Sequence, residues 1–283
     1  MYVSPLRYPG GKRKLVAHLA DFLDRQGLTH VDRIIEPFAG GASVSIALLE
    51  AGIAEQAVLN DIDPLIAAFW KIVFSPKAAE LVDRILNAEV TLRTWEELRS
   101  SDPTCELERA FKCLFLNRTS FSGSLQSAAG PIGGKAQTGA YLIDCRWNSE
   151  RLASRITELS ELGPRVKVRC ADFRRFIGSY KASCTRRPTT ETLWYLDPPF
   201  FHKADKLYRY CFDEADHRTL RKTVLSLNGT WMLSYDNCAE SRSMYSDCEA
   251  RSFVDMRYTA AKRSVVQRLD CTELVVTSAW RAT

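Results

Sequence analysis

An alternation of helix-like and strand-like patterns over the first 75 residues constrains the fold of this chain more than any other feature. Residues 12–27 carry apolar side chains at helical spacing and end at a glycine, and residues 32–41 form a short apolar run that enters a glycine turn. A helix-like segment that closes at Gly52, a second strand-like run at residues 55–63 and a helix from Pro64 follow. This βαβ order predicts an α/β fold with a Rossmann-like, doubly wound and mostly parallel sheet.

The pattern changes between about residues 76 and 165. Residues 76–117 are mainly helix-like, whereas residues 118–141 hold five of the 14 glycines and show no apolar periodicity, which indicates a loop or hairpin. Strand-like runs resume after residue 165. We therefore expect one catalytic domain formed by residues 1–75 and 166–283, with a mainly helical insertion at residues 76–165.

Composition excludes several classes of protein. The chain has no apolar run of about 18 residues and no apolar core near its start, so neither a membrane span nor secretion is expected. Nine scattered cysteines without a CxxC pair, and only four histidines, predict no metal site, no disulfide framework and a cytoplasmic location. The net charge of +5 is compatible with a polyanionic partner. A monomer or a weak dimer is expected.

The stretch LWYLDPPFF, Leu193–Phe201, places reactive groups at the end of a buried strand. The apolar run ends at Asp197, and Pro198 and Pro199 cannot donate backbone hydrogen bonds, so the strand must stop there. A carboxylate and a prolyl carbonyl at such a tip could accept both N–H bonds of an amine on an aromatic ring. That geometry favours a pyramidal nitrogen whose lone pair can attack an electrophile, while Phe200 stacks on the base. The alternative is an Asp-Pro turn with two core aromatics.

Acids at three other strand ends could surround a nucleoside-like ligand. Glu36 precedes a turn in which Gly40 and Gly41 let backbone approach a ligand, so it could face a cationic group. Asp61 lies about 20 residues further on, where an acid commonly binds ribose hydroxyls. Asp172 ends another strand-like run, and Phe173 beside it could cover an adenine ring. The alternatives are an ordinary tight turn and helix caps, and we expect capping by Asp63.

Eight motifs together resemble the DNA adenine-N6 methyltransferases of the Dam type, the D12 class. They occur in the family's order over about residues 6 to 237: RYPGGK, IEPFAGGASV, NDIDP, LNRTSFSG, ADF, YLDPPF, DHRTL and LSYDN. The resemblance implies S-adenosylmethionine as methyl donor, an adenine flipped out of double-stranded DNA as acceptor, and an insertion that recognises the target sequence. Cytosine-N4 methylation and a catalytically silent DNA-binding relative remain alternatives. The absence of GxGxxG disfavours a nicotinamide-dependent oxidoreductase.

The resemblance also implies roles for single residues. The catalytic segment matches Asp197, Pro198, Pro199 and Phe200. The donor-binding positions match Tyr8 and Lys12 near the methionine part, Phe38, Ala39 and Gly40 in the turn, Asp61 at the ribose, and Asp172 and Phe173 at the adenine. Arg7 matches a basic residue that faces DNA. The chain departs from the family at Ala42, where glycine is usual, at Phe200, where tyrosine is commoner, and in its glycine loop, so GATC is not implied as the target.

Basic residues in two regions could follow DNA phosphates. One group surrounds the glycine loop, and the other lies between the last two strands: Arg118, Lys135 and Arg146; Arg257, Lys262, Arg263 and Arg268. The alternative is a solvated basic face. We further expect Asp216 to cap a helix, and both Cys113 and Cys170 to lie in the core.

Overall fold

The computed structural model describes residues 4–7, 12–185, 191–202, 209–256 and 271–278. Its strands are β1 (Val31–Glu36), β2 (Ala54–Asn60), β3 (Val166–Arg169), β4 (Thr192–Leu196), β5 (Thr230–Asp236), β6 (Arg251–Met256) and β7 (Cys271–Thr277). They form one sheet in the order β3-β2-β1-β4-β5-β7-β6. Neighbours among β1 to β5 pair in parallel, and β7 is antiparallel to both β5 and β6. The predicted α/β fold with a mostly parallel sheet is therefore confirmed, although the sequence pattern did not predict β6.

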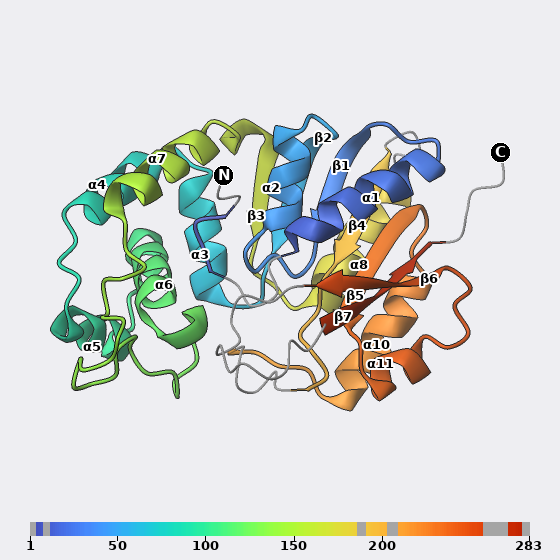
Figure 1. Ribbon diagram of the computed structural model, residues 1–283. Helices are drawn as coiled ribbons and strands as arrows, with labels where there is room; N and C mark the ends of the chain where they lie inside the picture. Colours follow the sequence, from blue (N-terminus) through green and yellow to red (C-terminus); the bar gives the residue numbers. More distant parts are fainter. Residues whose placement is uncertain (1–3, 8–11, 186–190, 203–208, 257–270, 279–283) are drawn as a thin grey trace.

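Helices cover both faces of this sheet (Figure 1). The helices are α1 (Arg13–Arg25), α2 (Ser43–Glu50), α3 (Pro64–Val73), α4 (Ala78–Leu86), α5 (Leu92–Ser100), α6 (Glu106–Thr119), α7 (Ser149–Ser160), α8 (Phe173–Thr185), α10 (Glu214–Leu225) and α11 (Ala239–Met244). Adjacent strand residues point to opposite faces. Ile34 accordingly packs in a core with α1, α2 and α3, whereas Ile35 packs in a second core with α8 and α10. Both faces of the sheet are therefore buried under helices, as a doubly wound fold requires.

Helices α4 to α7 lie beyond β3, at one end of the sheet (Figure 1). These helices do not form a separate hydrophobic core. Their buried side chains, such as Leu81, Cys113 and Ile156, belong to the same apolar cluster as Leu59 of β2 and Phe69 of α3. A smaller cluster around Trp95 and Phe115 packs α5 against α6. The described helices of residues 76–165 thus share a hydrophobic core with the parallel half of the sheet.

Local chemistry explains where several elements begin. Asp63 accepts the N–H of Leu65 and Pro64 occupies the first helical position, so α3 starts at the cap that the sequence predicts. Helix α10 starts one turn earlier than predicted: Asp213 is the cap, and Asp216 bonds back to the N–H of Asp213 in a capping box.

The two cysteines predicted to be buried differ. Cys113 is buried, but Cys170 is exposed, so that prediction was wrong. Cys170 follows β3, the edge strand of the sheet, where one flank of the chain has no neighbouring strand to cover it. Among the described residues, no helix has the length and apolar character that a membrane crossing requires.

Candidate active site

A pocket opens at the carboxyl ends of β1, β2 and β4, the edge at which parallel α/β sheets bind their ligands. The glycine turn after β1 forms one wall and the strand ends form the others. The lining residues are Lys12, Glu36, Phe38, Ala39, Gly40, Gly41, Ala42, Ser43, Val44, Asp61, Ile62, Asp63, Tyr195, Asp197, Pro199, Arg209 and Tyr210. Most of the residues predicted for the donor site and for the catalytic tip therefore meet in one cavity.

The glycine turn is held by the carboxylate of Asp61. The N–H of Gly40 donates to Asp61 Oδ2 and the N–H of Asp63 donates to Oδ1, both at 2.9 Å. From the other side, Trp70 Nε1 donates to the Gly40 carbonyl at 2.8 Å. Gly40 and Ala42 have φ values of 44° and 49°, in the left-handed region. Alanine adopts this region at some cost, which explains why a glycine is usual in the family at the position of Ala42.

Glu36 is a buried acid at the end of β1. Its Oε2 accepts a hydrogen bond from Ser45 Oγ, at the start of α2. Burial raises the pKa of Glu36 to about 8; the bond from Ser45 opposes this effect, and the Asp197 carboxylate reinforces it. Burial likewise raises the pKa of Asp61 to about 7, with the Asp63 carboxylate adding to the effect and the two backbone donors opposing it. Both acids are therefore poised to respond to a cation that enters the pocket.

Asp197 stands at the tip of β4 with its carboxylate on the pocket wall. Ser234 Oγ and Lys12 Nζ each donate to Asp197 Oδ1, at 3.2 Å. Burial raises the pKa of Asp197 to about 6, Lys12 lowers it, and the carboxylate of Glu273 raises it further. The Asp197 carboxylate therefore lines the same pocket as the glycine turn.

The two phenylalanines after the proline pair have different environments. Phe201 stacks on His217 with ring centroids 3.8 Å apart, and His217 Nδ1 lies 2.8 Å from the Tyr235 hydroxyl, so this ring belongs to the core. The Phe200 ring instead lies 5.6 Å from Lys12 Nζ and is half-buried. Of the two rings, Phe200 is the one placed beside the pocket.

Glu273 was missed by the sequence interpretation. It lies on β7, has no exposed surface, and forms an ion pair with Lys12 through Oε1. Burial opposes the charge of Lys12, but the carboxylates of Asp197 and Glu273 together raise its pKa above the ordinary value. The sequence signal that could have indicated Glu273 is an acid inside an otherwise apolar strand, CTELVVT.

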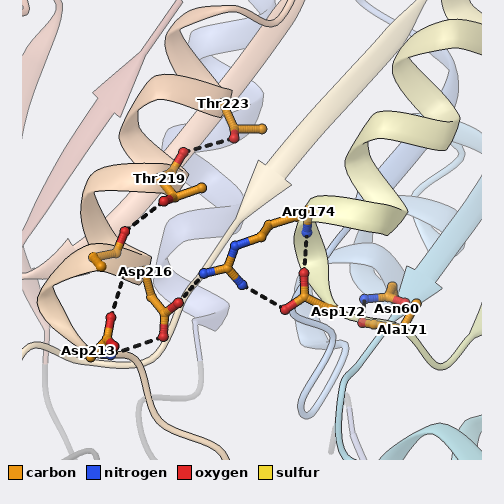
Figure 2. Close-up of polar contacts among 9 residues, drawn as sticks. Asn60, Ala171, Asp172, Arg174, Asp213, Asp216, Thr219 and Thr223 are labelled. Carbon is orange, nitrogen blue, oxygen red and sulfur yellow. Dashed lines mark hydrogen bonds and ion pairs between the residues drawn. The ribbon is translucent and has the colours of Figure 1, made fainter.

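Asp172 and Phe173 lie beside the pocket rather than on its wall. Asp172 caps α8 by accepting the N–H of Arg174 at 2.9 Å, and the Arg174 side chain joins Asp172 to Asp216 (Figure 2). Phe173 is buried 5.7 Å from the Phe38 ring. The helix-cap alternative thus describes Asp172 as it stands here, and a contact with the donor's adenine stays a prediction.

The predicted DNA-facing residues have different environments. Lys135 and Arg146 are exposed around the glycine loop. Arg118 is buried and its Nε donates to the Pro5 carbonyl at 2.7 Å, so in this conformation it anchors the N-terminal segment and does not face solvent. Arg7 is half-buried, and its backbone is bonded on both sides by Asn117. The remaining positions, Arg257, Lys262, Arg263 and Arg268, lie outside the described residues, as does Tyr8, which was predicted for the donor site.

One group of side chains bears on the expectation of no metal. His202, Cys238 and Glu240 each offer a ligand atom, and these atoms lie within 4.8 Å of one another. His202 Nε2 is 3.0 Å from Glu240 Oε2, and the Cys238 thiol caps α11. His202 and Glu240 contact each other and the Cys238 thiol contacts Ser241, so each of the three groups has a partner without a metal, and the expectation of no metal stays a prediction.

Comparison with known proteins shows the family of this chain. The sequence profile of the D12 class N6 adenine-specific DNA methyltransferases matches residues 8–260. The chain belongs to this family. A curated relative, the Type II methyltransferase M.MjaIII of Methanocaldococcus jannaschii, is 23% identical over 249 residues, which is 81% of each chain.

Two solved structures are similar in outline. One is the rRNA methyltransferase aviRa from Streptomyces viridochromogenes, with a TM-score of 0.44 and 15% identity over 96% of this chain and 86% of that one. The other is a putative SAM-dependent methyltransferase from Streptococcus mutans, with a TM-score of 0.39 and 12% identity over 94% of this chain and 48% of that one.

This D12 methyltransferase uses S-adenosylmethionine to methylate adenine N6 in DNA. The pocket chemistry fits that donor. Four carboxylic acids line the cavity against two basic side chains, Lys12 and Arg209: Glu36, Asp61, Asp63 and Asp197. Acceptors in excess suit a ligand that carries a sulfonium, an ammonium and ribose hydroxyls, and the glycine turn allows close backbone approach.

Proposed function

We propose that Asp197, Pro198, Pro199 and Phe200 hold the target adenine after it has flipped out of the duplex. The observation that carries this proposal is the position of the Asp197 carboxylate, on the wall of the acid-lined pocket beside the glycine turn. A base inside a duplex cannot reach such a recessed tip, so extrusion is required. Phe200, half-buried next to Lys12, is available to stack on the extruded base.

The chemistry follows from the properties of an aromatic amine. Its nitrogen lone pair is delocalised into the ring, which makes it a poor nucleophile. If the Asp197 carboxylate and the Pro198 carbonyl accept its two N–H bonds, the nitrogen becomes pyramidal and its lone pair is freed. The donor supplies an electrophilic methyl group on a sulfonium. As the N–C bond forms, the nitrogen becomes positively charged and acidic, and Asp197 is placed to receive the proton.

We propose that the donor is held by the residues of the glycine turn and by the neighbouring acids. Glu36 would face its cationic part, and Asp61 would accept from ribose hydroxyls through the lone pairs that the backbone donors leave free. The full donor set comprises Tyr8, Lys12, Glu36, Phe38, Ala39, Gly40, Asp61, Asp172 and Phe173. Asp172 and Phe173 would join it through a local shift of the α8 start.

We further propose that residues 76–165 read the target sequence, while residues 1–75 and 166–283 carry out catalysis. The exposed charges of Lys135 and Arg146 support phosphate contacts around the glycine loop. Arg7, Arg118, Arg257, Lys262 and Arg263 complete the proposed DNA surface. A cytoplasmic monomer or weak dimer without a metal ion fits this role.

Replacement of Asp197 tests the proposal. Asp197→Ala should abolish methyl transfer, measured as labelled methyl incorporated in a single turnover, and leave donor and DNA affinities within a few-fold. Asp83→Ala, which removes an exposed acid from α4, is the matched control. Retention of the wild-type rate by Asp197→Ala would disprove the assignment. Finding N4-methylcytosine and no N6-methyladenine in the product would instead favour the cytosine alternative.

A further inference from the structure

A buried charge network lies directly behind the proposed catalytic carboxylate. The Lys12 ammonium sits between Asp197 Oδ1, at 3.2 Å, and Glu273 Oε1. Lys12 is 4% exposed and Glu273 is 0% exposed, so neither group exchanges its partner freely for water. Burying a charge is costly unless it is paired with an opposite charge, so the pairing of Lys12 with both carboxylates is what allows these groups to stay ionised in the interior.

The network engages one oxygen of Asp197. Within the described residues, Lys12 and Ser234 both bond to this carboxylate through Oδ1. Ser234 Oγ in turn lies 3.2 Å from the Tyr195 hydroxyl, inside the core. The carboxylate is thereby fixed in rotation, and Oδ2 is left for a hydrogen-bond donor in the pocket.

The topology explains why Glu273 can reach this position. β7 is antiparallel to β5 and pairs Glu273 with Asp236, the last residue of β5. The start of β7 therefore lies at the edge of the sheet where the parallel strands end. Lys12, at the N-terminal end of α1, approaches the same edge from the face of the sheet that α1, α2 and α3 cover.

We propose that Glu273 is a positioning residue for methyl transfer: it anchors the Lys12 ammonium, which holds Asp197 Oδ1 and directs Oδ2 at the amine of the target base. A lysine side chain has a flexible four-carbon stem and three donors, so one carboxylate alone fixes it poorly. The second carboxylate removes that freedom and balances the charge. This inference rests on the proposed role of Asp197.

The network also sets the protonation of Asp197. The charged and titratable groups around Asp197 come from five elements: Lys12 at the start of α1, Glu36 on β1, Tyr195 on β4, Tyr235 on β5 and Glu273 on β7. Lys12 lowers the pKa of Asp197 and Glu273 raises it. Removing the charge of Glu273 should therefore lower that pKa, and removing Lys12 should raise it.

The experiment compares pH profiles of the single-turnover methylation rate at saturating donor and DNA. For Glu273→Gln we expect a rate at least fivefold below wild type at pH 8, unchanged donor and DNA affinities, and an acidic limb moved to lower pH. For Lys12→Met we expect a larger loss of the methylation rate, and an acidic limb of the pH profile that moves to higher pH. Glu249→Gln, on an exposed acid before β6, should match wild type in rate and profile.

The double variant separates positioning from simple stabilisation. Lys12→Met leaves Glu273 buried without its counterion, so adding Glu273→Gln should raise the melting temperature above that of Lys12→Met and move the limb back down. Glu273→Asp keeps the charge but shortens the reach. It should be slow with the wild-type midpoint, and it replaces Glu273→Gln if the latter does not fold.

Three outcomes would overturn the inference: a wild-type rate and limb in Glu273→Gln, shifts of the two single variants in the same direction, or losses explained by the unfolded fraction alone. Failure of the Asp197 assignment is distinguishable, since Asp197→Ala would then remain active. If Asp197→Ala is inactive while Glu273→Gln behaves as wild type, the catalytic role stands and the positioning role falls.

Discussion

Glu36 should make the ligand-free protein less stable as the pH rises. Its pKa is raised by burial from 4.5 to about 8, so the folded chain binds this proton more tightly than the unfolded chain does. Folding then takes up a proton between these two values, and the free energy of unfolding falls by up to about 1.4 kcal/mol per pH unit. The stabilising effect is complete below pH 4.5 and is lost as the pH approaches 8.

Between pH 7 and pH 8 Glu36 contributes most of the change in stability, because Asp197, with a pKa of about 6, is already ionised and Asp61, with a pKa of about 7, completes its ionisation near the start of this window. Over this unit the wild type should lose about 1 kcal/mol through Glu36 alone. Glu36→Gln mimics the neutral acid at every pH. At pH 8 it should be more stable than wild type by up to about 4 kcal/mol.

The assay is thermal or urea unfolding of the ligand-free protein at pH 6, 7 and 8. A domain of this size changes its melting temperature by about 2–4 °C per kcal/mol, so at pH 8 the melting temperature of Glu36→Gln should exceed that of the wild type by up to about 8–16 °C. Glu55→Gln, which neutralises an exposed acid on β2, is the control and should keep the wild-type slope. A wild-type stability that rises from pH 7 to pH 8, or a Glu36→Gln variant with the wild-type slope, would refute the reasoning.

The same substitution should impair donor binding. A buried anion that destabilises the empty pocket becomes favourable when a cationic ligand enters it, so the stability gained in Glu36→Gln is lost in affinity. We expect the dissociation constant for S-adenosylmethionine to rise about tenfold, equivalent to about 1.4 kcal/mol. Calorimetric titration at pH 8 measures this change. An unchanged affinity would remove Glu36 from the proposed donor set.

Three further predictions concern DNA and the N-terminal segment. Lys135→Ala and Arg146→Ala should each weaken binding to all DNA sequences and reduce the slope of log affinity against log salt by about 1, in contrast with Asp83→Ala. Asn117→Ala should lower the free energy of unfolding by about 1–3 kcal/mol, because it removes bonds to the backbone of Arg7 and Gly123. Phe200→Ala should weaken binding of DNA containing an unpaired adenine at the target, measured by fluorescence, while Phe200→Tyr should retain it.

The sequence predicted those parts of the site that depend on local rules. Parallel strands all end at one edge of the sheet, so the strand-end residues Glu36, Asp61 and Asp197 could be placed together without coordinates. The caps were harder, because a helix start that offers two acids, Asp213 and Asp216, satisfies the same local pattern in either register.

Burial of single polar side chains was not predictable in the same way. Arg118 follows an apolar helical stretch and lies beside a glycine loop, a context typical of a surface arginine. Its partner is the carbonyl of Pro5, more than a hundred residues away in the chain. Whether an arginine faces DNA or anchors a distant segment depends on tertiary contacts, and one sequence does not specify those contacts.

Glu273 shows most clearly which part of the site the sequence did not predict. A search of strand ends finds acids that follow parallel strands, but β7 runs the other way, so its first residues arrive at the edge where β5 ends. An acid near the start of the antiparallel strand therefore joins the active edge as directly as one after a parallel strand. Within CTELVVT, Glu273 shares its face of the strand with Val275, so the sequence marks the acid as unusual but does not identify its partner. Only the insertion of β7 between β5 and β6 makes it a buried counterion for Lys12. In a sheet with one reversed strand, the search for active-site acids must include the beginning of that strand.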